Sequence, residues 1–455
     1  MSRAPRSTRR PQERVIVCGF RSNEPGRDSD GDLTEAFGLV AAAEGEVIAP
    51  GILQRRPSPE PATLLGRGKV QEIKAEIDRL HPDVVVVDND LSPAQARNLE
   101  KAWGLRVVDR SELILDIFAR RARTRQARLQ VELAQSEYLS PRLRRMWTHL
   151  ERTEGAIGTR GPGETQLETD KRLLKRRIQD LREELREIEE RKQREVRSRN
   201  DQFTVGLVGY TNAGKSTLLN RLTGACEFVA DMLFATLDTR TRQWKLSDNR
   251  VVLLSDTVGF LQRLPHHLVA SFHATLEESL AADLLLHVVD AAHPAAAAQM
   301  RAVEDVLASQ SKDPRDAILV FNKIDCVHDP LGLQLLTVGQ PREVVYVSAH
   351  SGAGLDRLEQ AVRRRLDARS YLVDVYFPLS DGRFDAAIRS LATPSQDEIV
   401  DASAEHRVRV ALMEGALGNL RRQAGPGVRF EVVRGPGESL APADDDARGE
   451  LRPTA

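Results

Sequence analysis

The sequence predicts an α/β protein of several domains: a small N-terminal α/β domain, a long helical hairpin, a larger α/β domain and a small C-terminal α/β segment. Strand and helix patterns alternate over residues 13–110 and again from 203 to about 366, as they do in sheets built from βαβ units. Between these regions lies a stretch rich in helix formers that is interrupted by a cluster of glycines. At 455 residues, the chain is long enough for each domain to bury its own core.

The N-terminal domain, residues 13–110, follows a polar tail that we expect to be disordered over residues 1–12. Apolar patterning predicts strands at 15–20, 46–53, 83–87 and 105–108, and helices at 33–43, 69–80 and 92–103. The continuous apolar run at 83–87 is typical of a strand that is covered on both faces. Ser92 before Pro93 suits the first turn of the last helix.

The second region, residues 111–200, has the composition of a helical hairpin. Residues 112–139 contain neither Gly nor Pro and predict one long helix. A loop crowded with glycines follows, and then a second long helix in which apolar residues from Leu174 to Ile188 recur at alternating spacings of four and three. This spacing forms a seam for a partner helix, so we predict an antiparallel hairpin with a glycine-rich tip.

Two further domains complete the chain. Residues 201–367 alternate strand and helix signals, and residues 370–433 carry a smaller set of them at 372–377, 385–391 and 407–420. The last segment, 434–455, is rich in Pro, Gly and Asp, and we expect it to be a disordered tail.

A phosphate-binding loop is the first chemical motif of the third domain. Residues 209–216 form a complete G-x-x-x-x-G-K-S between an apolar strand and a helix. The glycines let backbone amides and the helix N-terminus approach a phosphate. Lys215 supplies positive charge to the β- and γ-phosphates, and the Ser216 hydroxyl is a ligand for Mg²⁺. The phosphate-binding residues predicted here are Gly209, Tyr210, Thr211, Asn212, Ala213, Gly214, Lys215, Ser216 and Thr217.

Two more elements of a phosphate site follow in order. Asp256 ends an apolar strand and begins the sequence Asp-Thr-Val-Gly, so it is expected to hold Mg²⁺, while the Gly259 amide contacts the γ-phosphate. A threonine between these elements should sense Mg²⁺ and the γ-phosphate when its loop is ordered. We predict Thr236 in this role, with Thr239 and Thr241 as alternatives, and we expect Lys215, Thr236 and Gly259 to act on the reacting phosphate.

A guanine-specific motif decides which nucleotide is bound. The carboxylate of Asp325, in Asn322-Lys323-Ile324-Asp325, can accept from both the N1–H and the N2 amino group of guanine, a donor pair that adenine lacks. After the next strand, Ser348 precedes Ala349, whose amide is expected to meet the guanine O6. Together these motifs predict a Ras-like P-loop domain that binds GTP and GDP and hydrolyses GTP with Mg²⁺.

One position departs from the Ras-like pattern. Ras-like GTPases place a glutamine directly after the glycine of D-x-x-G to orient the attacking water, and this chain has Phe260 there. A phenyl ring can neither donate nor accept that hydrogen bond. We therefore expect slow intrinsic hydrolysis and a site that another residue or a bound partner completes.

Four stretches together resemble the HflX family of ribosome-associated GTPases. They are LLGRGKVQEI at 64–73, ARLQVELAQ at 127–135, GPGETQLETD at 161–170 and GYTNAGKST at 209–217. The third agrees with the family's signature G-x-G-E-x-x-L-E-x-D, and the hydrophobic residue after D-T-V-G is expected in that family. The resemblance covers about residues 13–366. It implies binding to the large ribosomal subunit, rescue or splitting of stalled ribosomes, and hydrolysis that the ribosome stimulates.

The charge distribution gives independent grounds for RNA binding. The net charge of −1 conceals nine arginines and no lysine within residues 119–152, against three glutamates. The planar guanidinium suits phosphate, and Tyr138 and Trp147 could stack on bases. The alternative is a solvated face of the hairpin. The residues predicted to contact ribosomal RNA, in this basic segment and the glycine-rich tip, are Arg142, Arg144, Arg145, Arg160, Gly161 and Gly163.

Other interpretations stay open at this level. The sequence Leu-Gly-Arg-Gly-Lys at 65–69 is a weaker candidate for a second phosphate loop. The protein could instead be a regulatory GTPase that docks a protein partner through the hairpin, or a GTPase that serves an RNA-modifying enzyme. No apolar run is long enough to span a bilayer, and three scattered cysteines do not form a disulfide framework. We expect a cytoplasmic monomer.

Overall fold

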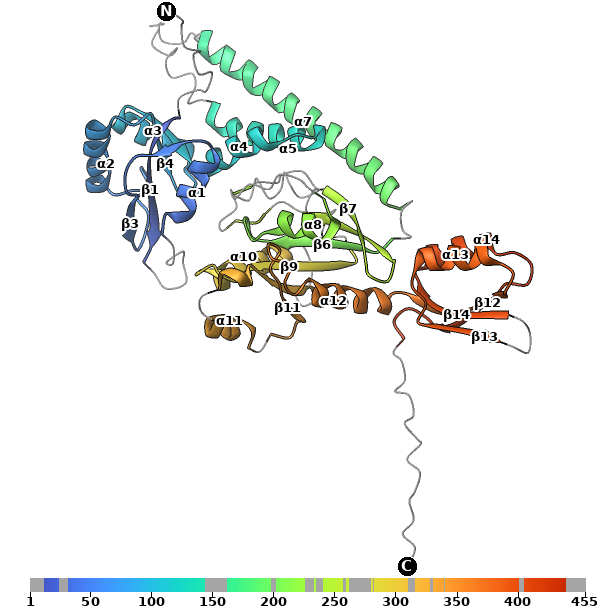
Figure 1. The fold of residues 1–455 in the computed structure, drawn as a ribbon. Coiled ribbons are helices and arrows are strands. Elements are labelled where there is room, and N and C mark those ends of the chain that lie inside the picture. The colour runs from blue at the N-terminus through green and yellow to red at the C-terminus, as the bar shows by residue number, and fades with distance from the viewer. Residues whose placement is uncertain are drawn as a thin grey trace, which may run out of the picture.

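The computed structural model describes residues 12–23, 32–143, 162–197, 202–225, 233–234, 240–256, 259–261, 280, 282–309, 316–327, 330–338, 340–400 and 405–438. Figure 1 shows the N-terminal domain in blue, the helices that follow it, the nucleotide-binding domain in green to brown, and the C-terminal domain in red. Among the described residues no helix is long and apolar enough to cross a membrane.

The N-terminal domain is a parallel sheet with helices on both faces. Its sheet consists of β1 (Arg14–Ser22), β2 (Glu46–Val47), β3 (Ile52–Arg56), β4 (Val84–Val87) and β5 (Arg106–Asp109), with β1 paired to β2, β3 and β4. The helices are α1 (Thr34–Ala42), α2 (Arg67–Leu80) and α3 (Pro93–Trp103). All four residues of β4 are buried, which confirms the prediction of a strand covered on both faces. The side chain of Ser92 caps α3 as expected.

The predicted strand at 46–53 is divided in the structure. β2 and β3 both pair in parallel with β1, and residues 48–51 between them lie outside the strands. Pro50 stands in this gap, and a proline cannot donate to a sheet ladder. The apolar pattern therefore located the strands within 46–53 but did not show the break between them.

The helical region contains two helices where the sequence predicts one. α4 (Arg110–Arg121) ends at Ala122, and α5 (Arg125–Leu139) begins after Thr124, whose side chain accepts a hydrogen bond from the Ala127 amide. The prediction of a continuous helix over 112–139 was wrong, because a threonine N-cap can start a new helix without Gly or Pro. α5 leads into a short 3₁₀ turn, η1 (Ser140–Arg142).

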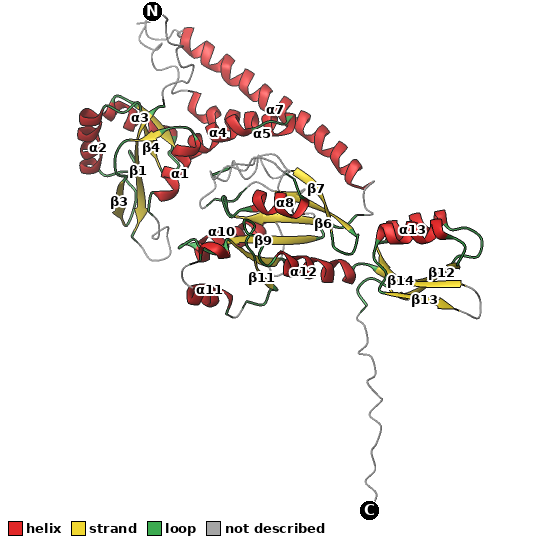
Figure 2. Cartoon of the chain, viewed as in Figure 1, coloured by secondary structure: helices red, strands yellow, loops and turns green. Residues whose placement is uncertain are grey.

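The long helix α7 (Pro162–Arg197) packs against α5 through the predicted apolar seam. Leu129 and Leu133 of α5 form one buried cluster with Leu181 and Leu185 of α7. Ion pairs flank the cluster: Arg177 with Glu132, at 2.7 Å, and Arg182 with Glu137, at 2.7 Å. α7 has 36 residues and α5 only 15, so much of α7 extends beyond the contact (Figure 2).

The nucleotide-binding domain has a six-stranded sheet in the order β11-β10-β9-β6-β8-β7, parallel except for β7. Its strands are β6 (Thr204–Gly209), β7 (Arg240–Lys245), β8 (Val251–Asp256), β9 (Leu284–Asp290), β10 (Ile318–Asn322) and β11 (Val344–Tyr346). Its helices are α8 (Lys215–Thr223), α10 (Ala296–Ser309), α11 (Pro330–Thr337) and α12 (Leu355–Ala368). Because parallel strands end at one edge of the sheet, the motifs that follow β6, β8 and β10 come together there.

The C-terminal domain is an antiparallel sheet in the order β13-β14-β12-β15 with two helices. Its elements are β12 (Tyr371–Pro378), α13 (Gly382–Leu391), β13 (Gln396–Val400), β14 (Glu405–Leu412), α14 (Glu414–Gln423) and β15 (Arg429–Arg434). Apolar residues of β12 and β14 share one core with both helices. The single pattern that the sequence shows at 407–420 thus covers a strand and a helix.

Candidate nucleotide site

The phosphate loop joins the end of β6 to the start of α8, as the sequence predicts. Gly214 is the N-cap of α8 and has a φ of 89°, a conformation that favours glycine. A Cβ at this position would lie 2.3 Å from Nδ2 of Asn322. The loop can therefore close against the guanine motif only with glycine here.

Lys215 is buried within this loop. Its side chain is 6% exposed, and its Nζ donates to the carbonyl oxygens of Gly209, at 3.1 Å, and Tyr210, at 2.9 Å. Burial lowers the pKa of Lys215 to about 8, against the opposing effect of the Asp256 carboxylate. A bound phosphate would add negative charge beside Nζ and favour the protonated form.

Two of the residues predicted to hold Mg²⁺, Ser216 and Asp256, meet directly. The hydroxyl of Ser216 donates to Oδ2 of Asp256 at 2.6 Å, and Asp256 is fully buried at the end of β8. A hydroxyl and a carboxylate are oxygen ligands of the kind that Mg²⁺ prefers. The residues present therefore fit the ion.

The D-x-x-G segment is bonded to the phosphate loop. The Phe260 amide donates to the Gly209 carbonyl at 3.1 Å, and the Thr211 amide donates to the Phe260 carbonyl at 2.8 Å. A Cβ on Gly259 would lie 2.6 Å from the Cα of Thr211, so no larger residue fits. The Phe260 ring is 2% exposed and belongs to an apolar core, so it does not point into the phosphate site.

The guanine motif is linked to the phosphate loop through Asn322. Its Nδ2 donates to the Ala213 carbonyl at 3.0 Å, and its Oδ1 accepts from the Ala349 amide at 3.0 Å. Asp325 is exposed, and a hydrogen bond from Ser348 lowers the pKa of its carboxyl, which favours the ionised acceptor that guanine recognition requires. The arrangement can bind a guanine base at one end and phosphates with Mg²⁺ at the other.

Comparison with known proteins also indicates a GTP-binding protein. Three family models match in order: "GTP-binding GTPase N-terminal" at 30–119, "GTP-binding GTPase Middle Region" at 121–199 and "50S ribosome-binding GTPase" at 204–323. The chain is 44% identical to GTPase HflX of Escherichia coli K12 over 387 residues, which are 84% of this chain and 90% of that protein. It is also 44% identical to GTPase HflX of Caldanaerobacter subterraneus over 377 residues, 82% and 85% of the two chains. The chain belongs to the HflX family.

Membership in the HflX family makes this protein a GTP-hydrolysing enzyme. Among solved structures, a GTP-binding protein from Sulfolobus solfataricus in complex with GDP aligns with 78% of this chain and 98% of its own. The sequence identity is 23% and the TM-score is 0.41.

Several residues predicted for the site of this HflX chain lie outside the described part of the structure. They are Thr236, its alternative Thr239, Arg144, Arg145, Trp147, Arg160 and Gly161. Gly163 lies in the first turn of α7, and Thr217 in α8. Thr241, an alternative to Thr236, pairs with Ser255 in the β7–β8 ladder. The roles proposed for all of these residues stay predictions.

Arg142 is mostly buried against the N-terminal domain. Its Nη2 donates to the Leu91 carbonyl at 2.6 Å and pairs with Asp109 at 3.1 Å, and its guanidinium lies 3.6 Å from the centroid of the Tyr138 ring. Tyr138 itself is 5% exposed. Both side chains thus have partners within the protein in this conformation. To contact RNA, Arg142 would have to leave the Asp109 carboxylate and pair with a phosphate instead.

The segment at 65–69 contributes to the start of α2. The Gly66 amide donates to Oε1 of Gln54 at 2.8 Å, and a Cβ on Gly66 would lie 2.6 Å from Nη1 of Arg56. The close approach of these side chains gives the glycine a packing role. Binding of a second phosphate at this loop stays an untested possibility.

Sequence reasoning missed contacts that stabilise the HflX site. Asp290 ends β9 and pairs with Lys323 at 2.7 Å, and its place after the mostly apolar stretch 284–289 was a usable signal. Oγ1 of Thr211 accepts from the Phe234 amide at 2.9 Å, and the hydroxyl of Tyr210 reaches a carboxylate of the N-terminal domain. For these last two contacts the sequence gives no signal, because the partners come from separate segments.

Proposed function

We propose that this HflX protein binds the large ribosomal subunit and hydrolyses GTP there, rescuing or splitting stalled ribosomes, with hydrolysis stimulated by the ribosome. The observation that carries the proposal is the buried ring of Phe260 at the position where Ras-like enzymes place the glutamine that orients water. A site of this kind needs a group supplied by another residue or by a bound partner for fast turnover. The match of residues 204–323 to a family described as "50S ribosome-binding GTPase" supports the ribosome as that partner.

The positions of Lys215, Ser216, Asp256 and Gly259 support the roles proposed for the phosphate site. Ser216 and Asp256, with Thr236 as the further proposed ligand, would hold a Mg²⁺ that would neutralise charge on the β- and γ-phosphates. Lys215, already held by two loop carbonyls, adds a positive charge to the same oxygens. The Gly259 amide contacts the γ-phosphate and so makes the D-x-x-G segment sensitive to its loss.

The base is selected at the opposite end of the site. Asp325 accepts from the two donors of the guanine edge, and the Ala349 amide, held by Asn322, donates to O6. The exposed side chain of Asp325 and its lowered pKa both support this role. GTP and GDP are then bound alike at the base, and the γ-phosphate alone distinguishes them.

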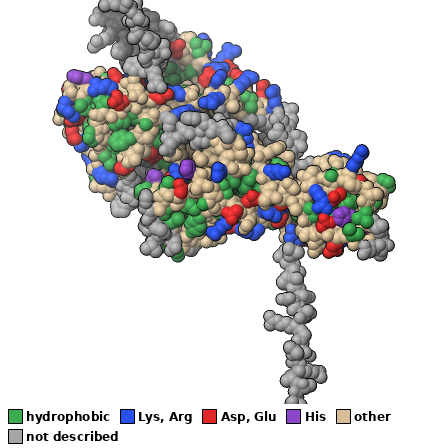
Figure 3. Space-filling view, viewed as in Figure 1, with side chains coloured by type: hydrophobic (Ala, Val, Ile, Leu, Met, Phe, Trp, Pro, Cys, Tyr) green, Lys and Arg blue, Asp and Glu red, His purple; other side chains and the backbone are tan. Residues whose placement is uncertain are grey.

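We assign the RNA-binding surface to the segment around the start of α7. Arg144, Arg145, Arg160, Gly161 and Gly163 are the proposed contacts, with Arg142 at the edge of the segment. Within α7, Arg172, Lys175 and Arg176 are exposed. Figure 3 shows basic side chains interspersed with acidic ones near the top of the molecule, where α7 lies. Arginine in such a setting can bind backbone phosphates without reading sequence.

Co-sedimentation tests the proposal. With a non-hydrolysable GTP analogue the protein should pellet with the large ribosomal subunit, and with GDP it should remain in the supernatant. Single-turnover hydrolysis measured with and without the subunit should show strong stimulation. Failure of both would favour one of the other functions, a hairpin that docks a protein partner or a GTPase that serves an RNA-modifying enzyme.

A further inference from the structure

The side chain of a phosphate-loop residue is bound by another domain. Tyr210, the second residue of the loop, is 6% exposed, and its hydroxyl donates to Oε1 of Glu35 at 2.8 Å. Glu35 lies in the first turn of α1 in the N-terminal domain, 175 residues earlier in the chain. The contact therefore joins the nucleotide site to the N-terminal domain at the loop itself.

Glu35 is in turn held by a buried network. The Arg110 guanidinium pairs with Glu35 at 3.1 Å and also with Asp88, which follows β4. Arg110 and Asp88 are 2% and 1% exposed. A carboxylate fixed by a buried guanidinium has little freedom to follow a moving tyrosine, so it fixes the Tyr210 hydroxyl relative to the N-terminal sheet.

The main chain of Tyr210 acts directly on the site. Its carbonyl oxygen accepts from Nζ of Lys215 at 2.9 Å, and its backbone forms a bridge with Phe260 in the D-x-x-G segment. One residue therefore has its side chain anchored in the N-terminal domain and its carbonyl beside the catalytic lysine. A shift of the side chain would displace the carbonyl that orients the Lys215 ammonium group.

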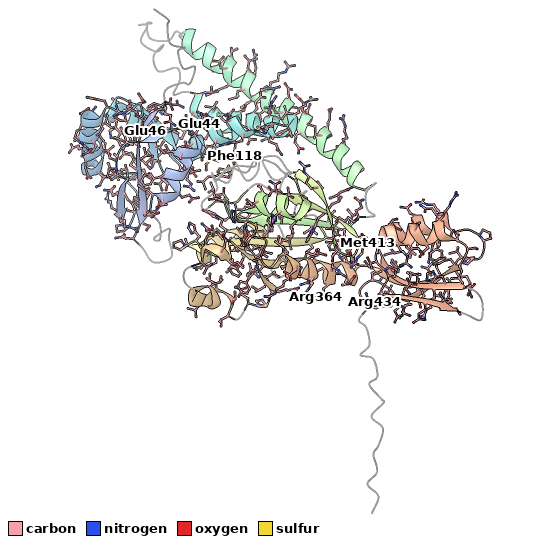
Figure 4. The ribbon with its side chains drawn as sticks, in the orientation of Figure 1. Glu44, Glu46, Phe118, Arg364, Met413 and Arg434 are labelled. Carbon is pink, nitrogen blue, oxygen red and sulfur yellow. The ribbon has the colours of Figure 1, made fainter. Side chains whose placement is uncertain are left out.

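A second contact supports the same interface. The ring of Phe118, in α4, packs edge-on against that of Phe234 with 4.6 Å between centroids. The Phe234 amide donates to Oγ1 of Thr211, the next residue of the phosphate loop. Figure 4 shows Phe118 on the side of the N-terminal region that faces the nucleotide-binding domain. Phe118 and Phe234, with Tyr210 and Phe260, belong to one apolar core that spans both domains.

We propose that Glu35 is a positioning residue for the nucleotide site. Through the Tyr210 hydroxyl it holds the phosphate loop, and with it Lys215, in the conformation that binds phosphate. The N-terminal domain thereby determines how long the nucleotide-binding domain retains GDP and GTP. The inference rests on GTP binding, which family membership shows, and is independent of the proposed ribosome role.

The experiment measures the dissociation rate of a fluorescent GDP from the full-length protein with Mg²⁺. Tyr210→Phe removes only the hydroxyl and should raise the rate by about 2–10-fold, the effect of one net hydrogen bond. Glu35→Ala should raise it by a similar factor. Glu35→Gln retains an acceptor oxygen and should return the rate close to that of the parent. In the double variant Tyr210→Phe/Glu35→Ala the two effects should not multiply, because both remove the same contact.

The matched control is the tyrosine–glutamate contact of the C-terminal domain. Tyr376 donates to Glu431 at 3.3 Å, and Tyr376→Phe should leave the dissociation rate unchanged. Thermal unfolding of each variant identifies general destabilisation, and Tyr210→Phe alone decides the case if Glu35→Ala does not fold. Release of GDP by Tyr210→Phe at the parent rate would overturn the proposal. Fully multiplicative effects in the double variant would also overturn it.

Discussion

The hydroxyl of Ser216 lies 2.6 Å from Oδ2 of Asp256, although 40 residues separate the two in sequence. Ser216 comes from the first turn of α8 and Asp256 from the end of β8, so only the parallel pairing of β6 with β8 brings them together. The pair defines where a cation can bind.

Asp256→Asn should therefore weaken the effect of Mg²⁺ on nucleotide retention. Removal of Mg²⁺ by EDTA should speed GDP release from the parent, and the variant should release GDP about 10-fold faster than the parent even with Mg²⁺. Interactions of charged groups are worth about 1.5–3 kcal/mol, which sets this scale. The exposed Asp305, in α10, supplies the control Asp305→Asn. If Asp256→Asn keeps the sensitivity of the parent to EDTA, Asp256 does not serve the ion.

Asp325→Asn should reduce affinity for GTP and allow xanthine nucleotides to bind. An amide NH₂ can donate to the O2 of xanthine, where guanine has a donor, so the preference should reverse. The lost hydrogen bonds are worth about 1–3 kcal/mol, or roughly 5–150-fold in affinity. Calorimetry with GTP and XTP measures both changes. Because Asp325 is exposed, the unfolding temperature should not change. Equal affinity of variant and parent for GTP would remove Asp325 from the specificity site.

Binding of GDP should take up protons above pH 8. The pKa of Lys215 is lowered to about 8 by burial, and a bound phosphate raises it again. The phosphate itself, with a second pKa of about 6, is already ionised there. Affinity should fall by at most about 10-fold per pH unit above 8. Calorimetry at pH 8.5 in two buffers of different ionisation enthalpy detects the uptake, and the same measurement at pH 7 is the control. No uptake at pH 8.5 would contradict the prediction.

His287 should make the nucleotide-binding domain sensitive to acid. Burial, aided by Arg342 and Lys215, lowers the pKa of His287 to about 3, and its Nε2 has no hydrogen-bond partner among the described residues. The unfolded chain, with a pKa near 6.5, binds the proton first, so stability is lost as pH falls from about 6.5 towards 3. This one group contributes at most about 1.4 kcal/mol per pH unit.

The test of His287 compares the pH dependence of chemical unfolding in parent and variant. His287→Gln should flatten the slope between pH 6.5 and 4, whereas His293→Gln, at an exposed position, should not. An identical slope in parent and His287→Gln would show that this histidine is not the source of the acid sensitivity.

Phe260→Gln should not restore fast hydrolysis. The Phe260 ring is buried in the core shared with the N-terminal domain. A glutamine amide there would lose its hydrogen bonds to water, so the substitution should lower the stability of the protein by about 1–3 kcal/mol. The large ribosomal subunit should still accelerate the parent, since supplied catalytic groups are worth about 10³–10⁵-fold in other GTPases. Single-turnover assays measure both effects, and Lys215→Ala should be inactive throughout. Fast turnover by the parent alone, unaffected by the subunit, would exclude a partner-dependent mechanism.

Short motifs and periodic patterns account for the local chemistry of this protein. A motif such as 209–217 predicts its own strand, loop and helix, because a few neighbouring residues set the backbone conformation and supply the phosphate ligands. Periodicity located β4 and the seam of α5 with α7 for the same reason. The guanine motif at 322–325 was enough to predict GTP as the nucleotide.

The tertiary structure decided which distant groups meet. It joins Ser216 to Asp256, uses Asn322 to hold both the phosphate loop and the guanine loop, and attaches Tyr210 to Glu35. It also places Arg142 beside Asp109. These outcomes depend on the packing of segments far apart in sequence, where burial and charge pairing act between side chains that no local pattern connects.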